Sequence, residues 1–588
     1  MELEWSLKEL YPDLNSKEFS EDFNRLKTMI KDIDSYAVKN LNNYNDIIVK
    51  LEKMLTFQND FETLVLKLSE YCSLILSTNA SDEKAMQTLN QIEDIVTDIT
   101  PSSVLFQKWV SGIADFNSVV NSSELIREHS FYLNELREKA KYTLSEKEET
   151  IISKMQTTGS ASWTKLQELL TSNIMPEVNI DGEIKKLPLP AVRNLAYSHK
   201  KEVRKAGYEA ELKAYPQIDD SIAYALNGIK GEVLTVSKLK GYNSPLEMTL
   251  INSRMDLKTL ESMFTAMKES LPEFRKYFRK KAELLGYKNG LPFYEMFAPI
   301  GKSNLSFTYE EASAYIIEKF SSFSKKLGDF AKYAFEHNWI DVLPRQGKRG
   351  GAFCSNLHCI GESRVLTNFT GSYSDVVTIA HELGHAYHGD CLKSEHPLNS
   401  DYPMPIAETA STFCETIINE ATLKNADRET SLTILESSIS DAAQVIVDIL
   451  SRFIFEDTVF KRRSDGFLSA KELCSIMLDA QKQTYGDGLD SKYLHEYMWL
   501  CKPHYYDANY NYYNFPYAFG LLFAKGLYSK YQKEGENFVK HYDNLLGATG
   551  KNSLYDVAKL ADIDLHSIDF WRSSIEVIKK DINKFISI

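Results

Sequence analysis

The 588-residue sequence lacks any uninterrupted apolar run of about 18 residues, the length that a transmembrane helix requires, so no membrane span is predicted. It also lacks low-complexity segments and internal repeats. Positive charge is scarce relative to negative charge, and the net charge is −14. This excess of acidic residues argues against a general surface for nucleic acid or anionic membranes. We therefore expect neither nucleic acid nor membrane as a partner, and the oligomeric state stays open.

Cysteine is sparse, and its spacing includes no CxxC pair. The seven cysteines are Cys72, Cys354, Cys359, Cys391, Cys414, Cys474 and Cys501. An odd number of cysteines, with no secretory signal peptide around Glu4 and Trp5, indicates reduced thiols. We therefore expect a cytoplasmic protein whose cysteines mostly fill the core.

Apolar residues are plentiful, at 43% hydrophobic and 12% aromatic. A chain of this length exceeds one ordinary core, so we expect two or more lobes. Apolar residues spaced by three and four predict helices over about the first 110 residues, with a break at 79–82 and a stop at Pro101.

Two further local signals mark the end of the first lobe. Ser145 with Glu148 predicts a helix start, and the turn at Asp181-Gly182 predicts a hairpin over 177–187. We expect a mainly α protein with an N-terminal helical lobe at 1–190. The last third of that lobe begins near residue 106 and ends in the hairpin. A second domain, at 191–588, carries the chemistry.

The most informative stretch is His381-Glu382-Leu383-Gly384-His385. On a helix, residues four apart project from the same face, so His381 and His385 can place two imidazole nitrogens on one metal ion. Glu382 can reach a water bound there but not the ion itself. Two nitrogen ligands, an open coordination position and a general base are what zinc-assisted hydrolysis needs.

The same letters could also describe two core or surface histidines beside a glutamate. The flanking residues argue for a metal site. Ser374 and Asp375 supply a helix start, and mostly apolar neighbours predict a buried helix at 374–389. Buried polar side chains need partners because unpaired ones are costly, and a metal ion supplies them.

A zinc site of this kind needs a third protein ligand. The metzincin pattern fails because residues 388 and 391 are His and Cys. A glutamate from a following helix is the remaining common option. Glu408 suits the ligand role, and Glu415, seven residues on, suits a role in orienting a ligating histidine. Glu415 is also the chief rival for the ligand itself. Weaker rivals are His388, Asp390, Glu395 and His396.

A β-like region precedes the expected metal helix. The segment 347–351 is a flexible loop or only a surface turn, and 364–369 predicts a strand. A free strand edge beside the metal would hold an extended peptide through backbone hydrogen bonds.

Four segments together resemble the M3 metallopeptidases, and within them the oligoendopeptidase F branch. They are HELGHAYH at 381–388, the segment 405–415, which is similar to a PxAExxSxFxE pattern, the aromatic segment 504–520, and the start at 5–12. The resemblance covers nearly the whole chain. It implies a two-lobed helical protein enclosing a deep channel, with a small sheet beside the metal helix. It also implies one Zn²⁺ per chain, held by His381, His385 and Glu408, and short peptides as substrates.

The resemblance also implies catalytic and binding residues beyond the metal. Related oligopeptidases use one histidine and two tyrosines seven apart to stabilise the negative oxygen of the intermediate. His504 with Tyr510 and Tyr517 fits after a one-residue insertion, and Tyr506 with Tyr513 keeps the same spacing. Most other tyrosines here are better explained as core. The expected substrate-binding residues are Gly350, Gly351, Val365, Thr367 and His388.

Three functions fit this sequence. The leading one is a zinc endopeptidase for short peptides, in which a zinc-activated water attacks the scissile carbonyl and Glu382 is the general base. A carboxypeptidase on the same fold would need a fixed cation for the terminal carboxylate, such as Arg349. A non-catalytic peptide binder is disfavoured, because it has no reason to keep Glu382.

Overall fold

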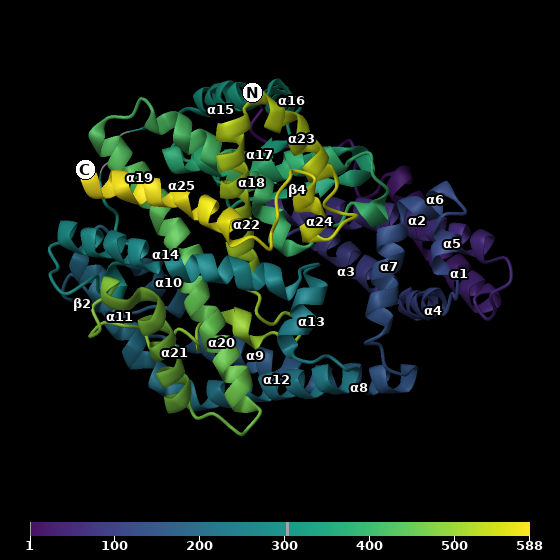
Figure 1. Ribbon diagram of the computed structural model, residues 1–588, viewed down its shortest axis with the longest axis horizontal. Coiled ribbons are helices and arrows are strands. Elements are labelled where there is room, and N and C mark those ends of the chain that lie inside the picture. Colours follow the sequence, from purple (N-terminus) through teal and green to yellow (C-terminus); the bar gives the residue numbers. More distant parts are fainter. Residues whose placement is uncertain (1, 302–304) are drawn as a thin grey trace. The chain divides into compact units, whose positions relative to one another are not determined.

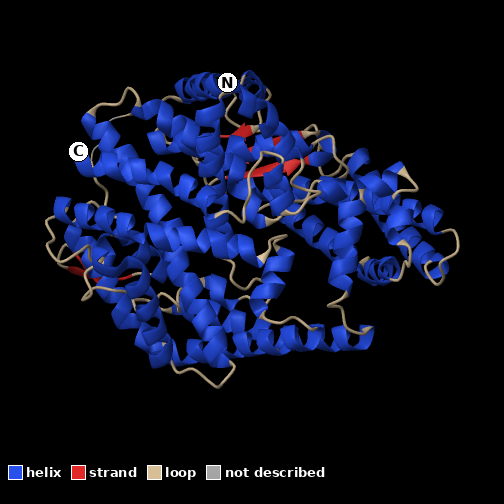
Figure 2. Cartoon of the chain, viewed as in Figure 1, coloured by secondary structure: helices blue, strands red, loops and turns tan. Residues whose placement is uncertain are grey.

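The computed structural model describes residues 2–301 and 305–588, and helices dominate it (Figure 2). Within these residues the named strands form one two-stranded and one three-stranded sheet. The prediction of a mainly α fold is confirmed. The chain divides into two compact units, each assembled from three segments: Met1–Tyr142, Leu305–Thr422 and Lys530–Ile563 in unit 1, and Thr143–Asn304, Leu423–Ser529 and Asp564–Ile588 in unit 2.

These units cut across the predicted domains. Residues up to Tyr142 of the predicted N-terminal lobe lie in unit 1, and the rest of that lobe lies in unit 2. Long-range packing decides which segments share a core, and local sequence patterns do not reveal it. The boundary near residue 190 stays a prediction.

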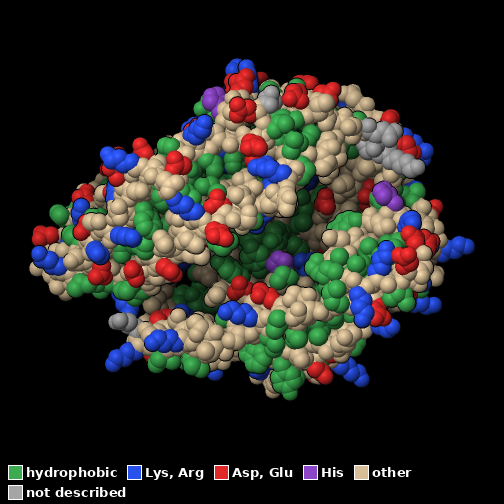
Figure 3. All heavy atoms as spheres, turned by 180° about the vertical axis from the view of Figure 1, so that it is seen from behind, with side chains coloured by type: hydrophobic (Ala, Val, Ile, Leu, Met, Phe, Trp, Pro, Cys, Tyr) green, Lys and Arg blue, Asp and Glu red, His purple; other side chains and the backbone are tan. Residues whose placement is uncertain are grey.

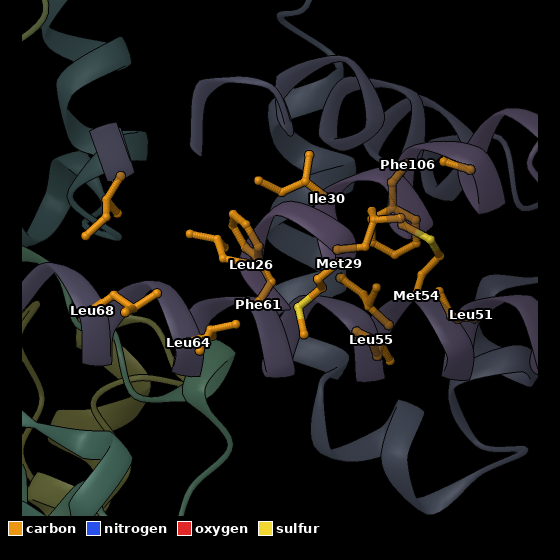
Figure 4. Close-up of a cluster of buried hydrophobic side chains, with 14 of the residues drawn as sticks. Leu26, Met29, Ile30, Leu51, Met54, Leu55, Phe61, Leu64, Leu68 and Phe106 are labelled. Atoms are coloured by element: carbon orange, nitrogen blue, oxygen red, sulfur yellow. The ribbon is translucent and has the colours of Figure 1, made fainter. Parts of the chain in front are cut away.

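The first part of unit 1 is a group of helices around an apolar core. They are α1 (Lys17–Asn40), α2 (Ile47–Thr78), α3 (Glu83–Thr97), α4 (Thr100–Ser111), α5 (Phe116–Val120), α6 (Glu124–Glu128) and α7 (Ser130–Ala140). Helix α1 packs on both α2 and α4. Figure 4 shows Leu26, Leu55 and Phe106 among the buried side chains that these three helices contribute. The predicted break at 79–82 is confirmed. The prediction that Pro101 stops the next helix was wrong: α3 already ends at Thr97, and Pro101 lies in the first turn of α4, where its missing N–H costs nothing.

The rest of unit 1 places a small sheet against helices (Figure 1). Its elements are α15 (Tyr309–Phe323), α16 (Lys325–Glu336), β3 (Ile340–Asp341), β4 (Phe353–Leu357), β5 (Glu362–Leu366), α17 (Tyr373–Leu392), α18 (Met404–Leu423), α23 (Glu536–Gly547) and α24 (Leu554–Lys559). Strand β5 lies between β3, which is parallel to it, and β4, which is antiparallel. Helix α17 packs on β4 and β5.

The predicted strand before the metal helix exists as β5, but the prediction that its edge is free was wrong. The backbone N–H of Val365 donates to Trp339 O at 2.9 Å, and that of Thr367 donates to Asp341 O at 2.9 Å. Strand β4 covers the other side. Strand β3 has only two residues, too few to leave a sequence pattern, so the sequence gives no sign that β5 is central. The outer strand beside α17 is β4.

Helix α17 begins slightly before the predicted Ser374. Ser372 is the N-cap: its Oγ accepts a hydrogen bond from Asp375 N at 3.2 Å, and Asp375 Oδ2 accepts one from Ser372 N at 3.0 Å. Such a capping box stabilises a helix by about 1 kcal/mol. The capping box fixes where α17 begins and therefore where its two histidines lie along the helix.

Unit 2 is built almost wholly from helices. Its elements are α8 (Glu146–Thr158), α9 (Ser160–Asn173), β1 (Glu177–Ile180), β2 (Glu183–Lys186), α10 (Leu189–Asn194), α11 (Lys201–Ala214), α12 (Asp219–Lys240), α13 (Pro245–Asn252), α14 (Leu257–Leu284), α19 (Arg428–Ala443), a π-helical turn (Gln444–Asp448), α20 (Ile449–Arg463), α21 (Ala470–Tyr485), α22 (Phe515–Glu534, whose last residues belong to unit 1) and α25 (Ile568–Ser587). The predicted capping box of Ser145 and Glu148 is confirmed at α8. The predicted hairpin is confirmed as β1 and β2, with φ of 53° at Asp181 and 91° at Gly182.

The surface carries acidic and basic side chains intermixed on the face shown in Figure 3. Within residues 2–301 and 305–588, none of the helices combines the length and the apolar character that a membrane span needs.

Candidate metal centre

Three side chains from two helices of unit 1 bring their donor atoms together. His381 and His385 lie one turn apart on α17, and their Nε2 atoms are 3.1 Å apart. Oε2 of Glu408, near the start of α18, lies 3.4 Å from His381 Nε2 and 3.5 Å from His385 Nε2. The three predicted ligands therefore form a nearly equilateral triangle of donor atoms.

This triangle has the dimensions of a tetrahedral zinc site. Ligand atoms about 2.0–2.2 Å from a tetrahedral centre lie roughly 3.3–3.6 Å from one another. Two imidazole lone pairs and a carboxylate at such separations repel unless a cation or protons lie among them. Two nitrogens and one carboxylate oxygen are also the donor types that Zn²⁺ accepts. The residues present fit the ion.

Glu415 holds His381 from the side away from the triangle. His381 Nδ1 donates to Glu415 Oε1 at 2.5 Å, which leaves the Nε2 lone pair free for a metal. Burial lowers the pKa of the His381 imidazole, but the hydrogen bond and charge of Glu415 outweigh it and raise the pKa to about 9. Glu415 thus contacts the far nitrogen of one histidine, whereas Glu408 faces both metal-side nitrogens. This contact favours Glu408 over Glu415 as the ligand.

Glu408 is itself oriented by its own helix. Ser411 Oγ donates to Glu408 Oε2 at 2.9 Å. Burial raises the pKa of the Glu408 carboxyl, but the hydrogen bond and positive charge of His385 lower it to about 2. The carboxylate is therefore ionised and ready to bind a cation. Ser411 was not among the predicted site residues, although it stands three residues after Glu408 in the segment that carries the resemblance.

Glu382 lies in the same cluster, and ligand atoms of His381, Glu382 and His385 are all within 4.8 Å of one another. Only 6% of its surface is exposed. Burial raises the pKa of Glu382, and the charges of the two histidines offset this only in part. A carboxylate whose pKa moves toward neutrality is better suited to take and return a proton.

A glycine allows the two helices to meet. A Cβ on Gly384 would lie 2.6 Å from Ala410 O and 2.6 Å from Ser411 Cα, which are backbone atoms of α18. Any larger residue would push α18 away from α17. Since His385 follows Gly384 directly and Glu408 precedes Ala410 by two residues, this contact sets the distance between the ligands.

Strand β4 also braces the metal helix. Asn356 Nδ2 donates to His385 O at 3.3 Å, and a Cβ on Gly389 would lie 2.4 Å from Asn356 Oδ1. No local sequence pattern pointed to Asn356. Two residues before Asn356, burial and the negative charge of Glu382 raise the pKa of the Cys354 thiol well above its usual range.

The substrate contact predicted for His388 has no support. His388 is fully buried, its Nε2 lies 2.8 Å from Thr549 Oγ1, and its ring stacks on Tyr402 with 4.0 Å between centroids. Burial lowers the pKa of His388 to about 3, so it stays neutral. It packs α17 into the core and offers a substrate no surface.

The other predicted substrate contacts have different surroundings. The side chains of Val365 and Thr367 are buried. Hydrogen bonds join the loop 347–351 to its surroundings: Arg349 N donates to Ser77 O at 2.8 Å, and Asn368 Nδ2 donates to Gly351 O at 2.8 Å. A Cβ on Gly350 or Gly351 would meet nothing within 4 Å, so the backbone is open to a ligand there.

The predicted oxyanion donors lie in unit 2. The rings of His504 and Tyr513 stack at 5.5 Å, and Tyr513 contacts Tyr510 at 5.7 Å and Tyr517 at 6.0 Å between centroids. The hydroxyl of Tyr506 is buried and donates to Trp499 O at 3.1 Å. Of the two predicted tyrosine pairs, the pair Tyr510 and Tyr517 therefore has both side chains accessible, because Tyr510 is exposed and Tyr517 is half-buried.

The chain is similar to known peptidases over most of its length. The model of peptidase family M3 matches residues 194–577, and that of oligopeptidase F matches residues 112–175. Oligopeptidase PepF of Bacillus subtilis is 24% identical over 96% of this chain and 84% of its own. An oligoendopeptidase F homolog of Lactococcus lactis is 24% identical over 99% of this chain and 96% of its own.

Solved structures share the fold. A crystal structure from Chlamydophila abortus superposes with a TM-score of 0.85 at 23% identity and covers 99% of this chain and 98% of its own. Oligoendopeptidase-F from Enterococcus faecium gives 0.70 at 16% identity, over 97% of this chain and 98% of its own.

Replacement of Gly384 should damage the centre without touching a ligand. Gly384→Ala should lower the free energy of unfolding by about 1–3 kcal/mol, because the added Cβ overpacks against backbone. It should also weaken zinc binding at least 10-fold, since α18 carries Glu408. Denaturant titration and competition with a zinc chelator measure the two effects. Gly466→Ala is the control, because its Cβ meets nothing within 4 Å; equal effects of both changes would refute the helix contact.

The two glutamates of α18 should separate by metal affinity. Glu415→Gln should weaken zinc binding about 10- to 100-fold, the usual cost of losing a partner of a ligating histidine. Glu408→Gln should abolish stoichiometric binding. Metal analysis after dialysis checks both variants. Retention of zinc by Glu408→Gln together with its loss from Glu415→Gln would reverse the assignment.

Proposed function

Since the chain belongs to peptidase family M3 and is a metalloendopeptidase, we propose that it uses Zn²⁺ to hydrolyse short, unstructured peptides. The observation that carries this proposal is the triangle of His381 Nε2, His385 Nε2 and Glu408 Oε2, with sides of 3.1–3.5 Å, beside the carboxylate of Glu382.

His381, His385 and Glu408 would hold the zinc ion. When bound, it supplies a Lewis acid that polarises the peptide carbonyl and makes a water more acidic. Ser411 and Glu415 keep Glu408 and His381 in the orientation for binding.

Glu382 acts as the general base. Its carboxylate takes a proton from the attacking water and then gives it to the leaving amine, so that the amine departs neutral. Its burial supports this role, because a raised pKa makes the proton easier to hold between the two steps.

The peptide backbone lies along the outer edge of β4. Strand β4 is an edge strand of its sheet and packs on α17. Its other edge pairs with β5, which follows it in the sequence. Backbone hydrogen bonds to an edge strand select an extended chain rather than particular side chains. Gly350 and Gly351 lie just before β4 and leave room for the peptide.

His504 with Tyr510 and Tyr517 donates hydrogen bonds to the oxyanion. Their grouping around Tyr513 supports this role. Burial, with the charge of Arg452, lowers the pKa of His504 to about 4, so the imidazole is a neutral donor at pH 7. Each such donor is worth roughly 3–4 kcal/mol in the transition state.

Removal of the base should stop turnover but not metal binding. Glu382→Gln keeps the shape of the side chain, so zinc should remain near one equivalent while kcat falls about 10²–10⁴-fold. The rate of cleavage of a quenched peptide and the zinc content, both measured on the same sample, test this. Glu420→Gln, on α18 and outside the cluster, should retain full activity. Wild-type kcat in Glu382→Gln would contradict the mechanism.

Blocking the ends of a substrate should not affect its cleavage, but the substrate must be able to adopt an extended conformation. A quenched peptide of about 5–20 residues, blocked at both ends, should be cut at the same internal bond as its counterpart with a free carboxyl terminus. An edge strand binds an extended peptide, which rises about 3.3 Å per residue, through its backbone and not through its ends. Folded proteins should resist, because unfolding them costs roughly 5–15 kcal/mol. Mass spectrometry of the products decides. Cleavage of only the free-ended peptide would indicate a carboxypeptidase, and binding without cleavage a non-catalytic binder.

A further inference from the structure

Unit 2 contains a cavity of about 190 Å³ that is not part of the metal centre. A cavity of about 150 Å³ accommodates benzene, so this one has room for an aromatic ring with a small polar group. Tyr197, one of its lining residues, is 60% exposed, and the cavity therefore reaches solvent beside it.

One wall of the cavity is aromatic. The rings of Tyr197 and Phe297 lie 4.9 Å apart, and Phe293 lines the same space. Flat apolar surfaces of this kind bind the body of a ligand by burial and ring contacts.

Several charges at the cavity are already neutralised in pairs. Arg204 and Glu295 form an ion pair at 2.5 Å and are almost fully buried. Asp448 pairs with Arg452 at 2.5 Å. Neither pair has charge left over for a ligand.

Two other cations are paired less completely: in the described part of the chain, Lys502 has no carboxylate partner, and Arg193 has a single, long ion pair with Glu211. Lys502 lines the cavity half-buried. Arg193 Nη1 is buried without a hydrogen bond and lies 3.4 Å from Glu211 Oε1, an oxygen that is also 3.4 Å from His495 Nε2. Burial, with the positive charge of Arg452, lowers the pKa of Lys502 to about 8. The cavity thus carries an excess of positive charge that an anion would relieve.

The backbone is irregular at the same place. The π-helical turn Gln444–Asp448 between α19 and α20 brings Gln444 and Asp448 to the cavity wall. Such turns are rare and occur frequently at functional sites, because they re-aim side chains at a cost in helix geometry.

We propose that this cavity binds a small carboxylate with an apolar body of about the size of one ring. Lys502 and Arg193 hold the carboxylate, and the body lies along Tyr197 and Phe297. The same chemistry is offered by a free organic acid and by the last residue of a peptide that ends in an aromatic or aliphatic side chain. The proposal does not depend on the proposed function.

Calorimetric titration of the zinc-loaded, full-length protein tests this site. We expect 3-phenylpropionate to bind and its neutral amide to bind at least 10-fold more weakly, because the amide loses the charge-assisted hydrogen bonds. Lys502→Met should weaken binding of the acid about 10- to 100-fold. Lys471→Met, an exposed lysine on α21 away from the cavity, should leave it unchanged.

A second pair of probes distinguishes the two sources of carboxylate. An N-acetylated dipeptide ending in phenylalanine is compared with the same dipeptide amidated at its carboxyl terminus. Tighter binding of the free dipeptide than of 3-phenylpropionate assigns the cavity to peptide ends, and the reverse order assigns it to a small acid. Equal affinity for acid and amide in both pairs, or no binding of either acid, would overturn the proposal. These comparisons use the wild-type protein, so they decide even if Lys502→Met does not fold.

Discussion

The close approach of α17 and α18 at Gly384 is the contact on which the metal centre depends. Helix α17 supplies two histidines one turn apart on one helix face, and these two ligands alone do not complete a metal site. The third donor must come from another helix at a fixed height, and backbone contact at a residue without a side chain fixes that height. The capping box at Ser372 and the brace from Asn356 hold α17 itself.

Electrostatics gives the same site a preference for a cation. His381, His385 and Glu408 face one another with lone pairs 3.1–3.5 Å apart, and Glu382 and Glu415 add further negative charge. Interactions between a cation and carboxylates in a partly buried site are strong, so a divalent cation among these donors is favoured. The folded chain therefore holds these donors ready for a cation before one binds.

The sequence alone could predict those site residues whose spacing follows the repeat of an α-helix. His381 and His385 follow from spacing and donor type, which left Glu408 and Glu415 as rivals for the third ligand; the family resemblance favoured Glu408. The hairpin and the α8 capping box follow from local turn and cap residues. The strand edge was misplaced because β3 has two residues and leaves no pattern. The burial of His388, the contact at Gly384 and the cavity around Lys502 depend on segments distant in sequence, and only packing brings these together.

X-ray absorption at the zinc K edge of the purified protein tests most directly whether His381, His385 and Glu408 form a zinc site. We expect only nitrogen and oxygen ligands, at about 2.0–2.2 Å, with imidazole scattering from two histidines. A sulfur shell at about 2.3 Å, which would place Cys354 or another thiolate on the metal, would contradict it.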